Sequence, residues 1–144
     1  MLVQQILNSK DSTGVITISP DAEVADAVNL LSSKRIGTVV VSKDGESLDG
    51  ILSERDIVRE LGKRGVGCLG DTVASMMTSK LVTCTPKDSA DSVLELMTKG
   101  RFRHMPVLDD GSMLGLISIG DVVKARLAEL SMEKDALQGM IMGH

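Results

Sequence analysis

The stretches Gly50-Ile-Leu-Ser-Glu-Arg-Asp56 and Gly115-Leu-Ile-Ser-Ile-Gly-Asp121 share one order of residue types: Gly, two apolar residues, Ser, and Asp three positions after the Ser. An apolar run that ends in Ser-x-x-Asp is typical of a strand leading directly into a helix. Further upstream, Val15–Pro20 resembles Leu81–Pro86 at nearly the same offset. The chain therefore contains an internal repeat, and its fold is predicted from one unit used twice.

The segment upstream of each Ser-x-x-Asp motif predicts a helix. Apolar residues in Val24–Leu31 follow the spacing i, i+3, i+4, i+7, and those in Ala90–Met97 repeat it. Ser19 and Thr85 are predicted to cap these helices, because each is followed by a Pro that suits the first helical position. The other predicted elements are strands at Val15–Ile18, Thr38–Ser42, Leu48–Leu52, Leu81–Thr85, Met105–Leu108 and Met113–Ile117, and helices at Glu54–Lys63 and Ile119–Leu130.

Each copy is therefore predicted to be a β-α-β-β-α unit. The fold class is α/β (α+β), with two repeats related by a pseudo-two-fold axis and two equivalent clefts where they meet. Residues 1–67 form the first repeat with an N-terminal lead-in, and residues 68–130 form the second. The lead-in is itself repeated, since Val73–Met77 resembles Val3–Leu7. Residues 131–144 are predicted to be a further short helix whose apolar side chains make an oligomer contact.

Composition narrows the possible functions. The 144 residues include one Phe and no Tyr or Trp, so the rings on which many single-strand and RNA binders stack bases are missing. The net charge of −4 opposes the positive field of a general nucleic-acid binder. Cys68 and Cys84 have no neighbouring His and no second pair, which favours small buried or half-buried thiols over a zinc site or a disulfide. Without a basic run before a long apolar stretch, we expect a cytoplasmic protein.

The Ser-x-x-Asp motif supports two interpretations. In the first, Ser53 and Ser118 cap the following helices, and Asp56 and Asp121 complete a capping box. In the second, the free N–H groups and the positive dipole end of the helix hold a phosphate with the Ser hydroxyl, and the Asp accepts both hydroxyls of a ribose. The two interpretations are compatible, and the second describes a nucleotide site.

Basic residues near the motifs could offset repulsion between a phosphate and the Asp. Arg55 and Arg59 flank the first Asp, while Arg101, Arg103 and His104 precede the strand at Met105 in the second copy. Each is alternatively an ordinary surface charge or, for the His, a core-edge residue. The first copy has Gly-Thr where the second has Arg-His, so two sites of unequal phosphate preference are expected.

Three phrases carry a family resemblance: Gly50–Arg59, Met97–Val107 and Gly115–Lys124. Together with the paired units, they resemble a tandem cystathionine-β-synthase (CBS) domain pair, or Bateman module, over roughly Met1–Leu130. The resemblance is stronger to stand-alone bacterial CBS-pair proteins than to CBS pairs inside an enzyme.

The CBS resemblance implies a regulatory module that binds AMP, ADP, ATP, NAD(H) or S-adenosylmethionine in the clefts between the repeats and senses nucleotide or energy state. It implies that the two motif Asp residues hold ribose hydroxyls and the two motif Ser residues hold the phosphate, while Thr17 and Thr83 line the adenine slot. It also implies a disc-shaped homodimer. One departure is Val39-Val40 in place of Met105-Pro106, which implies a differently shaped wall in the first cleft.

Other function classes fit less well. No nucleophile with a base, carboxylate pair or metal cluster is visible, so neither an enzyme nor a metal site is predicted. The alternative is a nucleic-acid-binding or protein-interaction module that uses the basic segment Arg101–His104. The expected partners are an adenosine-containing ligand, a second copy and a regulated protein in trans, with no membrane. The predicted ligand-binding residues are Thr17, Thr38, Ser53, Arg55, Asp56, Arg59, Thr83, Arg101, Arg103, His104, Met105, Ser118, Gly120 and Asp121.

Overall fold

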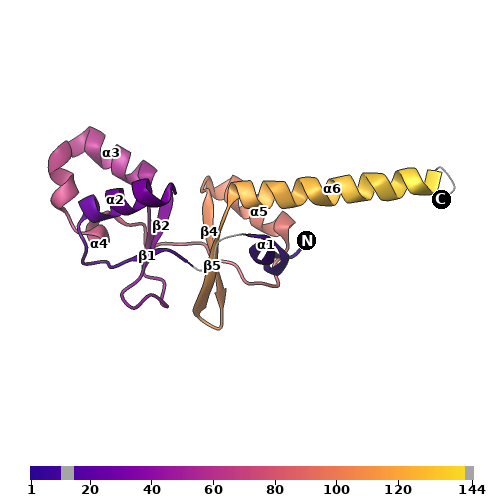
Figure 1. The fold of residues 1–144 in the computed structure, drawn as a ribbon, viewed down its shortest axis with the longest axis horizontal. Coiled ribbons are helices and arrows are strands. Elements are labelled where there is room, and N and C mark those ends of the chain that lie inside the picture. The colour runs from indigo at the N-terminus through magenta and orange to yellow at the C-terminus, as the bar shows by residue number, and fades with distance from the viewer. Residues whose placement is uncertain (11–14, 142–144) are drawn as a thin grey trace. The chain divides into compact units, whose positions relative to one another are not determined.

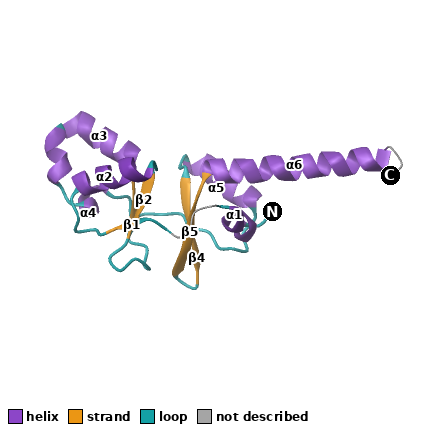
Figure 2. Cartoon of the chain, in the orientation of Figure 1, coloured by secondary structure: helices purple, strands orange, loops and turns teal. Residues whose placement is uncertain are grey.

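The computed structural model describes residues 1–10 and 15–141, which fall into two compact units. Unit 1 comprises Met1–Ser12, Thr83–Asp109 and Gly115–His144, and unit 2 comprises Thr13–Val82 and Asp110–Leu114. Both units mix helices with strands, as Figure 2 shows, and the predicted mixed fold class is confirmed. In the described part of the chain, no helix is both long and apolar enough to cross a membrane.

Unit 2 is a three-stranded sheet with helices on one face. Strand β2 pairs in parallel with β1 and antiparallel with β3, with Thr38 opposite Ser53. Val39, Val41 and Leu52 project from one face into an apolar core formed with the helices. The elements, labelled in Figure 1 except for β3 and η1, are β1 (Thr17–Ile18), α2 (Val24–Lys34), β2 (Thr38–Val41), β3 (Gly50–Ser53), α3 (Glu54–Arg64), the 3₁₀ helix η1 (Val66–Gly70) and α4 (Val73–Met76).

Unit 1 repeats this arrangement around a hairpin. Its strands β4 and β5 are joined by Asp110-Gly111, whose φ angles of 50° and 80° suit a tight type I′ turn. A single parallel bridge between Cys84 and Val107 occupies the place of the β1–β2 pairing in unit 2. The elements are α1 (Val3–Ser9), α5 (Ala90–Gly100), β4 (His104–Asp109), β5 (Ser112–Ser118) and α6 (Ile119–Ile141).

The two lead-in helices pack on the copies that they do not precede in the sequence. In unit 1, the Val3 N–H donates to the Asp88 carbonyl at 2.8 Å, and the Gln4 N–H donates to the Pro86 carbonyl at 3.0 Å. The matching bonds in unit 2 come from α4: Val73 N–H to Ala22 O at 2.8 Å and Ala74 N–H to Pro20 O at 2.9 Å. The sequence predicts that residues 1–10 belong with the first repeat, whereas α1 packs among the elements of the second.

The packing of each lead-in on the other copy explains why each motif begins with Gly. A Cβ on Gly50 would lie 2.7 Å from Met77 Sδ and 2.9 Å from the Thr78 carbonyl oxygen. A Cβ on Gly115 would lie 2.8 Å from Leu7 Cδ2. The motif therefore needs a residue without a side chain because the lead-in packs directly over it.

The predicted helix starts were wrong by about one turn. Helices α2 and α5 are capped by Glu23 and Ser89 instead of Ser19 and Thr85. The segments that contain the Pro residues form turns, closed by bonds such as that from the Asp88 N–H to the Thr85 carbonyl at 3.1 Å. The lead-in helices use the Pro carbonyls of these turns as acceptors, which holds the chain outside the helix. The predicted apolar stripes are confirmed, with Val24, Ala27, Leu31, Ala90, Val93 and Met97 buried.

The predicted separate helix from Ser131 was also wrong in its start. Residues 119–141 form one continuous helix, α6. No Gly or Pro lies between Asp121 and Gln138, so nothing in the backbone interrupts the helix at Ser131. The last part of the prediction, residues 142–144, lies outside the described residues.

Adding a methyl group to the two motif glycines tests the lead-in packing. We expect Gly50→Ala to lower the free energy of unfolding by about 1–3 kcal/mol, because its new Cβ meets a backbone oxygen that cannot rotate away. Gly115→Ala meets only the end of a flexible Leu side chain, so its cost should be below about 1 kcal/mol. Urea denaturation of both variants measures the difference, and equal costs would contradict the packing of the lead-ins over the two glycines.

Candidate ligand-binding sites

The corner of unit 2, where β3 runs into α3, is a complete capping box. The Asp56 N–H donates to Ser53 Oγ at 3.2 Å, and the Ser53 N–H donates to Asp56 Oδ2 at 3.0 Å. The first helical residue, Glu54, donates its N–H to the Gly37 carbonyl at 2.8 Å. The predicted Ser53 cap is confirmed. This leaves the Arg55 N–H as the helix-terminal donor with no hydrogen-bond partner among the described residues.

The Asp56 carboxylate is nearly buried and is paired with a cationic side chain. Only 8% of the residue is exposed, and Oδ1 accepts a hydrogen bond from Arg59 Nη2 at 3.0 Å. Arg59 lies one turn further along α3, with half of its side chain exposed. The sequence predicts Arg59 at this corner, and the structure places it there as the ion-pair partner of Asp56.

The corner of unit 1, where β5 runs into α6, has the same backbone pattern. The Asp121 N–H donates to Ser118 Oγ at 3.1 Å, and the Ser118 N–H donates to Asp121 Oδ2 at 2.9 Å. The Ile119 N–H donates to the Arg103 carbonyl at 2.8 Å, matching the Glu54 bond of unit 2. Gly120 is left, like Arg55, with its N–H unpaired within residues 1–10 and 15–141.

The cation at the unit 1 corner comes from the lead-in. Lys10 Nζ lies 2.8 Å from Asp121 Oδ2 and donates a second bond of 2.8 Å to the Leu116 carbonyl. Sequence reasoning missed this residue. A signal was available, because aligning the two lead-ins places Ser9-Lys10 on Ser79-Lys80. Lys80 is exposed and makes no ion pair among the described residues, so the two copies use different cations for the same Asp.

The Lys10 contact determines the ionisation of Asp121. Partial burial by itself would raise the pKa of this carboxyl. The hydrogen bonds from the Lys10 ammonium and the Ser118 N–H, with the Lys10 charge, outweigh burial and hold the pKa below its ordinary value. The carboxylate is therefore charged at neutral pH and can accept hydroxyl donors.

The remaining predicted residues of unit 2 lie on the sheet and at the start of α3. Thr17 pairs with Val40, so it shares a sheet face with Thr38, away from the face that packs on the helices. Thr38 is buried and lies directly opposite Ser53. Arg55 is exposed at the start of α3.

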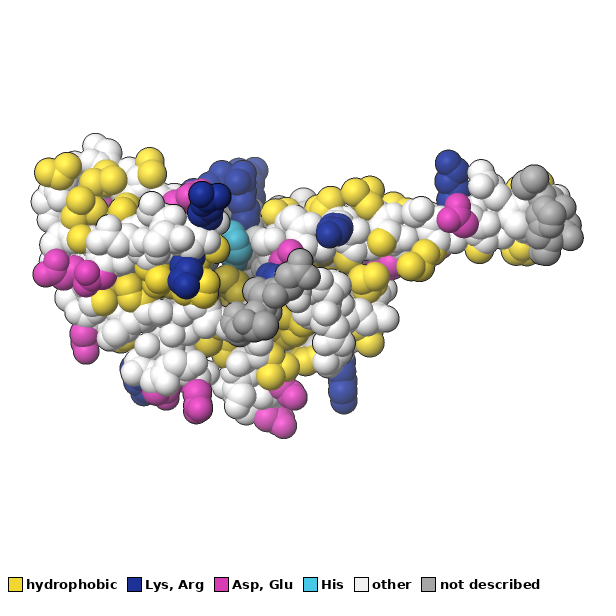
Figure 3. All heavy atoms as spheres, in the orientation of Figure 1, with side chains coloured by type: hydrophobic (Ala, Val, Ile, Leu, Met, Phe, Trp, Pro, Cys, Tyr) yellow, Lys and Arg dark blue, Asp and Glu magenta, His cyan; other side chains and the backbone are white. Residues whose placement is uncertain are grey.

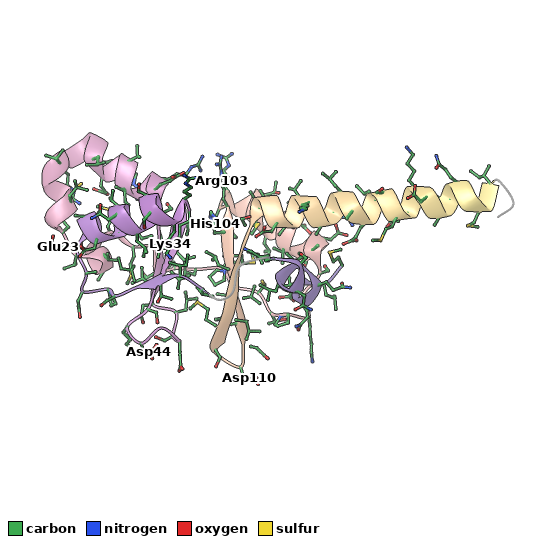
Figure 4. The ribbon with its side chains drawn as sticks, viewed as in Figure 1. Glu23, Lys34, Asp44, Arg103, His104 and Asp110 are labelled. Carbon is green, nitrogen blue, oxygen red and sulfur yellow. The ribbon has the colours of Figure 1, made fainter. Side chains whose placement is uncertain are left out.

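In unit 1, the basic residues lie beside the Ser118 corner. Figure 4 shows Arg103 and His104 together at the end of β4 remote from the Asp110 turn, and the Arg103 carbonyl bonds to the start of α6. Arg103 is exposed and His104 half-buried. Arg101 is an exposed, left-handed residue that ends α5.

The last two predicted residues of unit 1, Thr83 and Met105, are not among the residues that form the Ser118 corner. Thr83 is exposed and directly precedes the Cys84 bridge. Met105 is fully buried in the apolar core, so its side chain packs inside the unit instead of lining a surface.

Comparison with known proteins identifies the repeated unit. A model of the CBS domain matches residues 5–63 and again 73–128. The chain belongs to the CBS domain family. The CBS-domain protein ATU1752 from Agrobacterium tumefaciens has the same fold, with a TM-score of 0.82 and 39% identity over 88% of this chain and 99% of that one.

Two further CBS proteins are similar to this chain, one in sequence and one in fold. The mitochondrial CBS domain-containing protein CBSX3 of Arabidopsis thaliana is 39% identical over 127 residues, covering 85% of this chain. This chain spans only 62% of the length of that relative. The CBS domain protein PAE2072 from Pyrobaculum aerophilum, solved in complex with AMP, shares the fold at 23% identity, with a TM-score of 0.77 over 92% of this chain and 99% of that one.

Removing the Lys10 ammonium from this CBS pair should destabilise unit 1 in a pH-dependent way. Because Lys10 lowers the folded-state pKa of Asp121, its stabilisation is present above the unfolded Asp pKa of ~3.9 and is lost as pH falls through the folded value. We expect Lys10→Met to cost about 1 kcal/mol at pH 7 and progressively less below about pH 4. Denaturant unfolding against pH measures this, with Lys80→Met as the matched control that should cost nothing. A constant cost across pH would contradict the ion pair.

The two thiols of the CBS pair should be inert in the folded protein. Cys68 and Cys84 are both buried and unpaired, as predicted. Burial, with a smaller effect of Asp88, raises the pKa of the Cys84 thiol to about 12, so almost no thiolate exists at pH 8. A thiol reagent should label Cys84 at pH 8 only after unfolding. Labelling of the native protein at the rate of a free thiol would contradict this.

Proposed function

We propose that this CBS pair is a non-catalytic regulatory module that binds an adenosine-containing ligand, with AMP, ATP and NAD(H) as the candidates. The observation that carries the proposal is the repeated corner. Each unit presents a Ser hydroxyl, an ionisable carboxylate and an unpaired helix N–H within one turn of a helix N-terminus. A helix N-terminus favours a phosphate, and a carboxylate accepts the hydroxyl pair of a ribose.

The internal cations make this proposal compatible with a negatively charged ligand. Asp56 is compensated by Arg59, and Asp121 is compensated by Lys10. Each corner therefore presents hydrogen-bond acceptors without an uncompensated negative charge that would repel a phosphate. Capping and ligand binding use the same residues without conflict, because a carboxylate oxygen can accept more than one hydrogen bond.

We propose that the two corners bind with unequal affinity. The Ser118 corner has Arg103 and His104 where the adjoining strand begins, whereas the Ser53 corner has Gly37 and Thr38 at the matching positions. Regulation would follow if the ligand bound one conformation of the module, or of its partner, better than another, because only differential affinity shifts an equilibrium. The cytoplasmic location, the homodimer and the regulated partner in trans stay predictions.

Titration calorimetry with AMP, ATP and NAD tests the proposal. We expect two unequal sites in the native protein, and loss of one site in each of the single variants Asp56→Asn and Asp121→Asn, with affinity reduced by about tenfold or more. Asn keeps an oxygen that can accept the hydrogen bond from the backbone N–H of the capping Ser, and it removes the charge. Lys80→Met is the control that should retain both sites.

Absorbance offers an independent check. A chain with no Trp and no Tyr is almost transparent at 280 nm, so a band near 260 nm in the purified protein reports a bound adenine. Absence of binding by all three ligands, with native stability retained, would overturn the proposed function. Salt-sensitive binding of an oligonucleotide in their place would favour the alternative based on Arg101–His104.

A further inference from the structure

The two corners differ in how many hydrogen-bond acceptors their Asp leaves free. At the Ser53 corner, Asp56 Oδ2 accepts bonds from both the N–H and the hydroxyl of Ser53, each at 3.0 Å. Asp56 Oδ1 accepts the bond from Arg59 Nη2, also at 3.0 Å. A carboxylate has about four acceptor positions, so both oxygens of Asp56 are engaged and about one position is left. A ribose that offers two hydroxyls finds too few acceptors there.

Asp121 at the Ser118 corner is more open. Its bonds from the Ser118 N–H at 2.9 Å and from Lys10 Nζ at 2.8 Å both end on Oδ2. Oδ1 accepts no hydrogen bond from any residue in the ranges 1–10 and 15–141. The Asp121 side chain is 27% exposed, against 11% for Asp56. One complete carboxylate oxygen is therefore free to accept the hydroxyl pair of a ribose.

The two Ser hydroxyls differ in the same direction. Ser53 donates its hydroxyl to Asp56 Oδ2, so this hydroxyl is not free to donate to a phosphate. The Ser118 hydroxyl accepts the Asp121 N–H and donates to no acceptor in the described part of the chain. A Cβ added to Gly120 would meet only Ser118 Oγ, at 3.6 Å, so the start of α6 is uncovered. The Ser118 corner therefore offers a phosphate both a hydroxyl and an open helix N-terminus.

Arg59 is the residue that closes the Ser53 corner. Figure 3 shows Lys and Arg side chains at several places on the surface, so an exposed cation is not unusual in this chain. The matching residue of unit 1, Lys124, is such a cation: it is exposed and forms no ion pair with a described carboxylate. We propose that Arg59 competes with the ligand's ribose for Asp56, which makes the Ser53 corner the weaker of the two ligand sites. This inference rests on the proposed function.

The charge of Arg59 and its hydrogen bond have opposite effects on a bound nucleotide. The positive charge favours a phosphate, whereas the bond to Asp56 Oδ1 competes with the ribose hydroxyls. Adenosine separates the two effects, because it presents the ribose without a phosphate. Removing the guanidinium therefore strengthens adenosine binding, and the lost charge has little influence on a neutral ligand.

Titration calorimetry with adenosine tests the role of Arg59. We expect Arg59→Met to bind adenosine about tenfold more tightly than the native protein at the Ser53 corner, because no charge-assisted hydrogen bond has to be broken. Adding Asp56→Asn to this variant should remove the gain, which assigns it to this corner. Lys124→Met is the matched control, since it removes a cation from the same helical position without touching an Asp, and it should bind as the native protein does.

The sign of the effect separates competition from a structural role. A residue that only supports the corner would weaken adenosine binding when it is removed. Unchanged or weaker adenosine binding at the Ser53 corner of Arg59→Met would overturn this inference alone, provided that the native protein binds AMP. A native protein that binds neither adenosine nor AMP would overturn the proposed function as well.

Chemical modification tests the displacement in the native protein, without relying on the folding of a variant. Phenylglyoxal reacts with guanidinium groups, and peptide mass spectrometry reports the modification of each Arg. Saturating adenosine should speed the modification of Arg59 several-fold, because its guanidinium leaves Asp56. Arg64 is the matched control: it lies on the same helix, is also ion-paired and is 48% exposed against 51% for Arg59, and its rate should not change. Unchanged or slower modification of Arg59 would overturn the inference.

Discussion

Each compact unit depends on backbone hydrogen bonds between a lead-in helix and the turn before a longer helix. The turn carbonyls of residues 20 and 22, or 86 and 88, accept N–H donors from α4 or α1. These bonds satisfy donors at the start of a short helix that would otherwise lack partners. They also bring Met77 and Leu7 over the motif glycines, so the lead-in covers the strand that ends in the Ser-x-x-Asp corner. The packing of each unit follows from these contacts between the lead-in of one copy and the turn of the other.

The atoms that stabilise each corner in the fold are the same atoms that the proposed ligand would contact. The Ser hydroxyl and the Asp carboxylate satisfy backbone N–H groups, which fixes the angle at which the helix leaves the strand. The geometry that holds the helix in place also leaves one N–H group and charged oxygens at its positive end. A ligand site built this way needs little rearrangement, because most of its polar groups are held in place without the ligand.

The two corners differ most in the source of their cation. Arg59 reaches its Asp from one turn away on the same helix, which is a local contact that sequence spacing can suggest. Lys10 reaches Asp121 from the other end of the chain. Each cation has a basic residue at the matching position of the other copy: Lys124 matches Arg59, and Lys80 matches Lys10. Neither lysine forms an ion pair with the Asp of its own corner. Divergence between the copies therefore lies in tertiary contacts that a comparison of motifs does not show.

The amino-acid sequence alone determined the repeated unit, the buried stripes of α2 and α5, the Ser53 and Ser118 caps and the family, because these depend on residues within a few positions of one another. Only the tertiary structure decided which copy each lead-in packs against, which cation meets Asp121, where α2 and α5 begin and how far α6 continues. The beginnings of α2 and α5 depend on carbonyls claimed by the lead-ins, and the Asp121 cation comes from a residue 111 positions away. Local propensity carries no information about such distant partners, since the free energy that selects them arises only when the chain is folded.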